Sequence, residues 1–415
     1  MRFGRQAVAI EEATRRLMQH VRVLPPETVE LDQADGRVLA ADLEASGSLP
    51  PFDRSAMDGY AVRAKDTLGA SPKKPLALRV VGAVMAGEVP SFRLLKGEAA
   101  RIMTGAMIPE GADAVILFEQ TGNPGADTEA VAVKKQLAAG ENIIRQGEEA
   151  AAHEIVLKAG EIVNAGAKAV LSTFGYTRIP VTRQPRIGIM PTGDELVAPQ
   201  QELTPGKIRD CNTAMLAQLV RESGGIPVVF PPVSDDDHNA AASIEERIRQ
   251  VDLLVTTGGV SVGDLDVIAS FVDRTDVALL FNRVAMRPGS PTTAARIADK
   301  LLCALSGNPG ACFTGFQLFV KPLIRQMLGE LHPEVQELEG VLVGDVKRPC
   351  PYPRYLRGKM VLKQAVLHVI PDRLEKLAPL RSLKESNCLI VIPPGGAGAS
   401  EGELVKVVQI APFPL

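Results

Sequence analysis

The feature that most constrains the fold is an alternation of apolar runs and helix-spaced segments between residues 183 and 330. Runs of strand length, such as PRIGIM, IPVVF and VDLLV, are each followed by a glycine-rich or acid-rich turn and then by apolar residues at helical spacing. This alternation predicts a parallel β-sheet with helices on both faces. The fold class expected for this part of the chain is therefore α/β.

The stretch VDLLVTTGGVSVGDLD, residues 251–266, stands at the centre of that region. Its apolar run predicts a buried strand that ends at Gly258 and Gly259, where a ligand can approach the backbone without meeting a Cβ atom. Ser261, Gly263 and two aspartates follow. Open α/β sheets bind ligands at the carboxyl ends of their strands, so this loop is a candidate binding site. The alternative is a tight turn between strand and helix whose acids are simply solvated.

Length and composition exclude several classes of protein. A chain of 415 residues is too long for one hydrophobic core, which predicts two to four domains. A net charge of -3 provides no bulk basic field for nucleic acid. The five cysteines form no C-x-x-C pair, which argues against a disulfide framework or a zinc ribbon and fits a reducing cytosol. No apolar run has the length of a signal core or a membrane span, so a soluble, cytoplasmic protein without membrane association is expected.

The segments on either side of the α/β region have a different pattern. Residues 8–21 have apolar positions at helical spacing, which predicts an amphipathic opening helix. Residues 76–133 contain short apolar runs separated by glycine and proline, which predicts a small β-rich insert. After Pro333 the strand-like runs return over about 80 residues. We therefore expect a C-terminal β domain.

Three N-terminal loops are unusually polar. The loop LPPFDRSAMDGYAV contains Asp58 just before a β-like run, RIMTG places Thr104 at a predicted strand end, and ENIIRQGEE groups an arginine with two glutamates. Each is either part of a site or a well-capped turn, because the same residue types serve both purposes. Taken one at a time, the loops leave this choice open.

The loops of the α/β region bring charged side chains toward one edge of the predicted sheet: Asp194, Glu195, Asp235, Asp264, Asp266 and Arg287. Carboxylates gathered with glycine loops, without a cluster of histidine or cysteine, favour a divalent cation such as Mg²⁺ together with phosphate oxygens. The arginines would contact anionic groups of the ligand. Spacing alone thus indicates a phosphorylated ligand bound with Mg²⁺.

Seven motifs together resemble a known family. In chain order they are PPFDRSAMDGYAV, RIMTGAMIPEGADAVI, ENIIRQGEE, PTGDELV, TTGGVSVGDLD, RPGSP and SGNPG. They are similar to motifs of the molybdopterin molybdotransferase family, to which the E domain of gephyrin is related. Seven motifs in the same order along the whole chain favour the site interpretation of each loop over the capped-turn interpretation.

The resemblance implies a multidomain architecture and a homodimer. Residues 1–46 and 150–181 would form a split N-terminal linking domain, and residues 47–149 a β-rich insert domain. Residues 182–330 would form the molybdopterin-binding α/β domain, and residues 331–415 a C-terminal domain like a β-barrel. Two such chains would form an elongated homodimer.

The resemblance also implies a reaction and the residues for it. The family inserts molybdate into adenylylated molybdopterin, releasing AMP, and a separate molybdopterin adenylyltransferase is expected to supply that substrate. The implied catalytic residues are Asp58, Thr104, Glu195, Asp235 and Asp266, of which Glu195, Asp235 and Asp266 would hold Mg²⁺. Asp58 and Thr104 would act across the dimer interface. The residues expected to bind substrate are Gly258, Gly259, Ser261, Gly263, Arg283, Arg287, Ser290, Gly307, Asn308 and Arg357.

The chain departs from the family at several positions. The family commonly has lysines where this chain has Arg283, Arg287 and Ser290, and a serine where it has Ala311. A family glycine-serine-histidine stretch is replaced by KLAPL around Leu377, with no hydroxyl there. A guanidinium fork does not reproduce an ammonium point charge, so the oxyanion contacts are expected to differ. Ser290 and Ala311 leave open a paralogue that prefers tungstate, and the relationship to gephyrin leaves open a non-catalytic molybdopterin-binding scaffold.

Overall fold

The computed structural model describes residues 6–123, 129–233, 240–259, 267–272, 274, 276–347, 349–372 and 380–411. The chain forms two compact units. The large unit contains Met1–Ala40, Ala159–Asn164 and Arg178–Leu415, and the small unit contains Ala41–Lys158 and Ala165–Thr177. We describe each unit by itself. The four-domain division made from the sequence stays a prediction.

A six-stranded sheet forms the centre of the large unit, in the order β16-β13-β17-β20-β19-β18. The bounds are β13 (Arg186–Pro191), β16 (Ile226–Val229), β17 (Leu253–Thr257), β18 (Val277–Phe281), β19 (Thr293–Ile297) and β20 (Lys300–Leu305). The first four strands in the order run parallel, as the sequence predicts. The edge formed by β19 and β18 is antiparallel, which the sequence pattern did not indicate.

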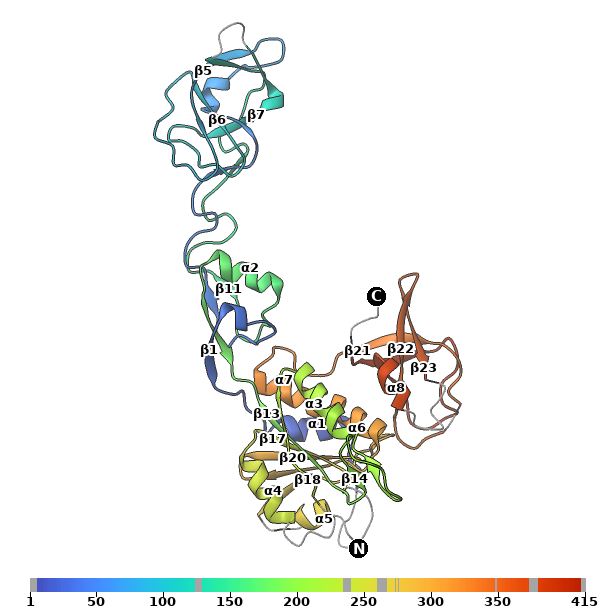
Figure 1. Cartoon of the computed structure of the whole chain (residues 1–415). Helices are drawn as coiled ribbons and strands as arrows, with labels where there is room; N and C mark the ends of the chain where they lie inside the picture. The colour runs from blue at the N-terminus through green and yellow to red at the C-terminus, as the bar shows by residue number, and fades with distance from the viewer. Residues whose placement is uncertain are drawn as a thin grey trace. The chain divides into compact units, whose positions relative to one another are not determined.

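Helices cover both faces of this sheet (Figure 1). On one face, α1 (Ile10–Met18), α3 (Asn212–Glu222), α6 (Pro309–Gly315) and α7 (Lys321–Leu328) enclose a core that includes Leu17, Leu216 and Phe316. On the other face, α4 (Ala240–Arg249) and α5 (Val267–Val272) enclose a core that includes Ile244 and Phe271. The strand β17 is buried along its whole length, because its side chains face one core or the other.

The helix that follows β20 contains a π turn. α6, the π turn η4 (Phe316–Val320) and α7 follow one another without a break, so that residues 309–328 form one continuous helix. The Lys321 N–H donates to the Phe316 carbonyl, five residues back, immediately before Pro322. Proline has no N–H and its ring crowds the carbonyl four residues earlier, so a locally widened turn accommodates it. Gly329, at φ 78°, ends the helix in the left-handed conformation.

The C-terminal part of the large unit is a closed barrel in the order β21-β23-β22-β24-β25. The bounds are β21 (Glu337–Leu342), β22 (Arg354–Lys363), β23 (Val366–Pro371), β24 (Cys388–Ile392) and β25 (Leu404–Gln409). Its core contains Met360, Ile390 and Val407, all fully buried. The short helix α8 (Leu380–Glu385) precedes β24. The prediction of a C-terminal β domain is confirmed.

The large unit also contains a two-stranded ribbon in which β1 (Pro26–Glu30) pairs antiparallel with β12 (Arg178–Thr182). The small unit has its own six-stranded sheet, in the order β7-β4-β6-β5-β9-β8. The bounds are β4 (Gly59–Val62), β5 (Leu76–Val84), β6 (Glu98–Ile102), β7 (Ala114–Leu117), β8 (Thr121–Gly122) and β9 (Ala130–Val133). Here too the predicted β-rich character is confirmed.

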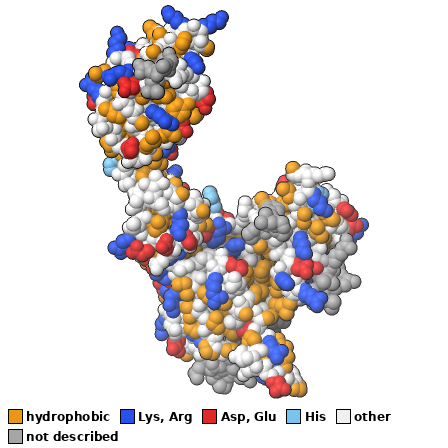
Figure 2. All heavy atoms as spheres, turned by 45° about the horizontal axis from the view of Figure 1, so that its top comes forward, with side chains coloured by type: hydrophobic (Ala, Val, Ile, Leu, Met, Phe, Trp, Pro, Cys, Tyr) orange, Lys and Arg blue, Asp and Glu red, His pale blue; other side chains and the backbone are white. Residues whose placement is uncertain are grey.

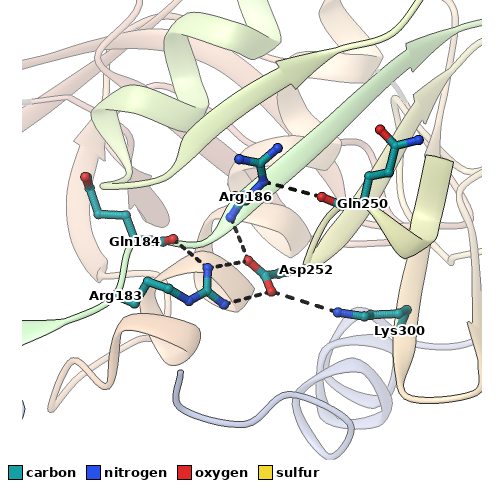
Figure 3. A network of polar contacts seen from close by, with 6 residues as sticks. All are labelled: Arg183, Gln184, Arg186, Gln250, Asp252 and Lys300. Carbon is teal, nitrogen blue, oxygen red and sulfur yellow. Dashed lines mark hydrogen bonds and ion pairs between the residues drawn. The ribbon is translucent and has the colours of Figure 1, made fainter. Parts of the chain in front are cut away.

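An ion-pair network lies at the amino ends of the parallel strands (Figure 3). Arg183 donates to both carboxylate oxygens of Asp252 at 3.0 Å, and the Arg186 N–H donates to the same carboxylate at 2.8 Å. Lys300 lies 3.9 Å away, at the start of β20. Burial would raise the pKa of Asp252, but these hydrogen bonds hold it below its usual value. The network joins β13, β17 and β20 at the edge opposite their carboxyl ends.

The distribution of surface charge and the state of the cysteines agree with the expectations from composition. On the face shown in Figure 2, basic and acidic side chains are interspersed. All five cysteines are free thiols, and burial raises the pKa of Cys303 and Cys312 to about 12. Within the described ranges, every helix is too short or too polar to cross a bilayer.

Candidate functional site

Two glycine loops meet at the carboxyl ends of the parallel strands. Gly258, which follows β17, has φ +98°, and a Cβ atom there would lie 2.6 Å from the Thr192 carbonyl oxygen. A Cβ atom on Gly307, which follows β20, would lie 3.4 Å from the Gly258 Cα atom. Gly259 has φ +59° and lies beside the same threonine. A side chain at Gly258 would collide with the Thr192 carbonyl oxygen, and the positive φ angles of Gly258 and Gly259 favour glycine, which accounts for the TTGG sequence.

Asn212 holds these loops together. Its Nδ2 group donates to Thr257 Oγ1 at 2.8 Å and to the Gly307 carbonyl at 2.8 Å. The side chain is 7% exposed, so its hydrogen bonds are largely shielded from water. Helix α3 begins at Asn212, and the side chain of Cys211 at its N-cap position makes no capping hydrogen bond. The carboxylate that accepts from the Thr213 N–H belongs to Asp210, at 3.0 Å.

The loop SGNPG begins the long helix at the same edge of the sheet. Asn308 caps the helix, since its Oδ1 accepts from the N–H groups of Gly310 and Ala311 at 3.1 and 3.2 Å. Pro309 occupies the first turn, where its missing N–H costs nothing. The helix N-terminus contributes partial positive charge to this edge.

Arg357 of the barrel strand β22 reaches this helix start. A Cβ atom on Gly310 would lie 2.4 Å from Arg357 Nη1, so the guanidinium occupies the space that a side chain would fill. Arg357 Nε donates to Ser382 Oγ at 2.7 Å, which fixes the guanidinium from the side of α8. The sequence showed no hydroxyl around Leu377, which is outside the described residues. Ser382, five positions later, supplies a hydroxyl to Arg357.

Arg287, on the RPGSP loop, lines the same cavity as Asn308 and Arg357. Its N–H donates to the Pro353 carbonyl at 2.9 Å, and its carbonyl accepts from the Tyr355 N–H at 2.8 Å, so the loop pairs with the start of β22. The barrel and the α/β sheet are therefore joined by backbone hydrogen bonds at this point. This pairing brings Arg287 and Arg357, far apart in sequence, to one cavity.

The resulting oxyanion cavity has a volume of about 300 Å³. Its lining residues are Arg287, Pro288, Asn308, Pro349, Cys350, Arg354, Tyr355, Leu356, Arg357 and Asp372. Guanidinium groups from Arg287, Arg354 and Arg357 outnumber the single carboxylate of Asp372. A site of this charge, next to a helix N-terminus, is suited to a tetrahedral or phosphate anion.

Arg283 and Ser290 contact each other, but neither is among the described residues that line the oxyanion cavity. Ser290 Oγ donates to the Val284 carbonyl at 2.8 Å and lies 3.4 Å from Arg283 Nε. The Arg283 guanidinium lies 6.0 Å from the centroid of the Tyr352 ring. In this structure the Ser290 hydroxyl therefore forms a hydrogen bond within its own loop.

The predicted Mg²⁺ set is described only in part. Glu195 is exposed, and its carboxylate folds over Gly193, where a Cβ atom would lie 2.4 Å from Glu195 Oε2. Asp235, Asp266, Ser261 and Gly263 lie outside the described residues. The residues that are described contain no group of three or more histidine, cysteine or acidic side chains placed to hold a metal.

In the small unit the structure brings Asp58 and Thr104 together. Asp58 Oδ1 accepts from the Thr104 N–H at 2.7 Å and from Thr104 Oγ1 at 2.8 Å. These hydrogen bonds hold the pKa of the Asp58 carboxyl below its usual value, so it is ionised at neutral pH. Both side chains are exposed. The pair therefore presents a fixed carboxylate to solvent.

Backbone pairing places the polar loops of the small unit side by side. β3 (Arg54–Ser55) pairs with β10 (Ile143–Ile144), and the Gly105 N–H donates to the Ser55 carbonyl at 2.8 Å. A Cβ atom on Gly59 would lie 1.9 Å from the Ile116 carbonyl oxygen, which requires the glycine of MDGY. The three motifs predicted from sequence thus form one surface.

Some residues of the candidate site were not predicted from the sequence: Arg354, Ser382 and Asp372. Arg354 is 6% exposed and Ser382 is 4% exposed. The sequence does not reveal that Arg354 is buried, and arginines are mostly exposed, so nothing in the sequence pattern marked it as a site residue. The same holds for Ser382.

Fold and site together define an α/β protein with an anion-binding cavity completed by a C-terminal barrel. Family models match three successive parts of the chain. They are described as "MoeA N-terminal region (domain I and II)" for residues 8–175, "Probable molybdopterin binding domain" for residues 188–326, and "MoeA C-terminal region (domain IV)" for residues 339–410.

Several known proteins are similar to nearly the whole chain. The molybdopterin molybdenumtransferase of Bacillus subtilis is 40% identical over 98% of this chain and 95% of its own length. That of Staphylococcus aureus strain MSSA476 is 38% identical over 97% of this chain and 96% of its own length. A crystal structure of a molybdopterin biosynthesis MoeA protein from Pyrococcus horikoshii is 32% identical, covers 97% of this chain and 99% of its own, and has a TM-score of 0.82. This chain belongs to the MoeA family of molybdopterin molybdenumtransferases.

Proposed function

We propose that this protein completes the molybdenum cofactor by transferring molybdate into adenylylated molybdopterin, with release of AMP. The observation that carries the proposal is the oxyanion cavity, in which Arg287 and Asn308 from two loops converge with Arg357 of strand β22. Molybdate is a tetrahedral dianion, and the substrate carries phosphate groups. Guanidinium groups bind such anions through two parallel hydrogen bonds.

Four residues in or beside the cavity have a definable task in this reaction. Arg287 and Arg357 would hold the oxyanion and offset its charge, and Ser382 would keep the Arg357 guanidinium in one orientation through its 2.7 Å contact. Asn308 fixes the start of the helix, whose N–H groups favour negative charge. Preorganised donors of this kind stabilise charge that develops when a phosphoanhydride is cleaved.

Asp58 would contribute a negative charge rather than a proton. Its pKa lies below its usual value because Thr104 donates two hydrogen bonds to it. At neutral pH it is therefore ionised and suited to accept a hydrogen bond or to offset positive charge, while its lowered pKa makes it a weak base and leaves it no proton to donate. We propose that the Asp58–Thr104 pair acts on the substrate bound by a second copy of the chain in a homodimer.

We also propose a requirement for Mg²⁺. Glu195, an exposed carboxylate next to a strand end, has the hard oxygen chemistry that Mg²⁺ prefers, and Asp235 and Asp266 are the other candidates. When bound, Mg²⁺ would neutralise phosphate charge at the bond that breaks. The cytoplasm as the site of action, and a separate adenylyltransferase as the source of substrate, belong to the same proposal.

A test is the release of AMP from adenylylated molybdopterin by the purified protein. Reactions would contain no oxyanion, molybdate or tungstate, each with Mg²⁺ and with EDTA. The proposal expects release that depends on both Mg²⁺ and molybdate and that yields active cofactor. Release with tungstate but not molybdate would support the paralogue alternative, and binding without release would support the scaffold.

A further inference from the structure

A second cavity lies in the large unit, on the C-terminal half of the long helix 309–328. Its volume is about 470 Å³, larger than that of the oxyanion cavity, and the two share no lining residue. The ends of helices α3 and α7, the segment 333–336 and the chain after β25 enclose it. Neither the proposed reaction nor the sequence motifs assign a role to it.

One face of the helix provides polar groups to this cavity. Gln317, Lys321 and Arg325 follow one another at intervals of four residues, so their side chains form a single stripe. Arg325 is already neutralised, because its Nε group donates to Glu330 at 2.6 Å and its Nη1 to the Glu334 carbonyl at 3.1 Å. Arg325 therefore forms part of the cavity wall, and its charge is already paired with that of Glu330.

Gln317 is a buried polar residue in the wall of this cavity. The residue is 3% exposed, and its Oε1 atom has no hydrogen-bond partner among the described residues. It belongs to the π turn and lines the cavity. A buried carboxamide left unpaired costs free energy, and such groups in native structures commonly meet a ligand or water. A half-turn about its last bond lets the carboxamide present either its oxygen or its NH₂ group.

Lys321 offers a cation beside that carboxamide. The structure gives it neither a hydrogen bond nor an ion pair within the described part of the chain. Burial lowers its pKa, Arg325 lowers it further, and Glu222 and Glu330 offset part of this effect without contacting it. Lys321 is partly buried, and an ammonium in such a place is stabilised by an anion that enters the cavity.

The remaining wall is largely apolar, with side chains that include Pro322, Leu328, Pro333, Val335 and Ile410. Glu222 and Glu334 are exposed at the rim. We propose that this cavity is a second ligand site, which takes a small organic anion: Lys321 and Gln317 bind its carboxylate or phosphate group, and its apolar part packs on the prolines and aliphatic side chains.

The test is a ¹⁹F NMR titration of the full-length protein with three probes that share a 4-fluorophenyl ring and differ in their head group. They are 4-fluorobenzoate, 4-fluorophenyl phosphate and the neutral 4-fluorobenzyl alcohol. The proposal expects saturable binding of at least one anion and binding of the alcohol at least about tenfold weaker, as the loss of one charged hydrogen bond implies. The preferred anion identifies the head group. Equal binding of all three probes would overturn the proposal.

Variants locate the binding. Lys321→Met is expected to weaken anion binding at least about tenfold. Lys363→Met, at an exposed position of the same unit, is expected to leave it unchanged, whereas Arg357→Met should remove only the binding that the oxyanion cavity contributes and leave the Lys321-dependent binding in place. Loss of all anion binding in Arg357→Met would assign the probes to the oxyanion cavity alone and overturn the second site. Arg357 also serves the proposed reaction, so the Arg357→Met variant tests the proposed function and the second ligand site separately.

A second variant keeps the test decisive if Lys321→Met does not fold. Gln317→Leu removes an unpaired buried polar group at nearly constant volume, so it is expected to raise the midpoint of thermal unfolding while weakening anion binding. A more stable variant with weaker binding would show that Gln317 is kept for the ligand. Binding as tight as in the parent protein would contradict the proposal.

Discussion

Arg357 illustrates how single residues build the oxyanion cavity. Its guanidinium lies where a side chain at Gly310 would be, and Ser382 holds its Nε atom. The glycine of SGNPG and the arginine of the barrel are therefore complementary. An arginine without such a partner would move among rotamers and would bind an oxyanion with a larger loss of entropy.

We predict that Arg357→Met lowers the rate of molybdate-dependent AMP release by about 10²–10³, the usual cost of removing one preorganised donor. The matched control is Lys359→Met on the same strand, where the lysine pairs with Glu385 at the surface. That pair is expected to contribute little. The measurement is single-turnover AMP release by both variants. Equal rates for the two variants would remove Arg357 from the site.

At Asp58 the testable quantity is a pKa. Thr104→Val removes the hydroxyl hydrogen bond and keeps the backbone N–H, so the pKa of Asp58 should rise part of the way toward its usual value. NMR titration of the labelled carboxyl carbon measures this. Thr173→Val, on helix α2 (Ala165–Thr173) of the same unit, is the control and should leave the pKa of Asp58 unchanged. An identical pKa in Thr104→Val would contradict the role given to the hydroxyl.

At the scale of elements, the parallel strands are fixed at both ends by different means. Glycine loops and Asn212 join them at the carboxyl edge, where ligands are expected. At the amino edge the Asp252 network joins them (Figure 3). The amino edge is thus expected to serve stability, and the carboxyl edge function.

We predict that Asp252→Asn lowers the free energy of unfolding at pH 7 by about 1.5–3 kcal/mol, the range for hydrogen bonds to charged groups. The folded-state pKa of Asp252 is lowered, so its contribution is present above the unfolded-state pKa, near 3.9, and is lost as pH falls through the folded-state value. Denaturant unfolding of both proteins between pH 7 and pH 2 measures this. A difference that persists undiminished at the acid end would contradict the ionic origin.

The strands and helices themselves were largely predictable. The apolar run at β17 and the helical spacing of α1 and α3 match the structure because burial on two faces or on one stripe leaves a clear period. The antiparallel edge of β18 and β19 was not predictable, because a short apolar run has the same pattern in either direction. Nor was the short helix α8, which carries Ser382.

At the scale of the whole molecule, the site depends on contacts that no local pattern encodes. The motifs showed that Arg287 and Asn308 belong to loops at one sheet edge. The approach of Arg357 depends on how the barrel packs against those loops, and its assignment from sequence rested on family resemblance alone. Backbone hydrogen bonds between Arg287 and Tyr355 provide the physical reason.

The proposed homodimer leads to a prediction about mixed proteins. If Asp58 acts on the substrate held by Arg357 of the other copy, a mixture of Asp58→Ala and Arg357→Met chains contains dimers with one intact site. Random reassociation makes half of the dimers mixed, so about a quarter of the parent activity should return. Each variant alone is the control. Mixtures that stay as inactive as the single variants would show that Asp58 and Arg357 do not act across a dimer.

The most direct measurement is a crystal of the protein with molybdate, with diffraction recorded on either side of the molybdenum absorption edge. The anomalous signal of molybdenum locates the metal independently of any assumption about the site. We predict a peak in the oxyanion cavity, within hydrogen-bonding reach of the Arg287 and Arg357 guanidinium groups through its oxygens. A peak elsewhere in the large unit, with this cavity empty, would contradict the assignment.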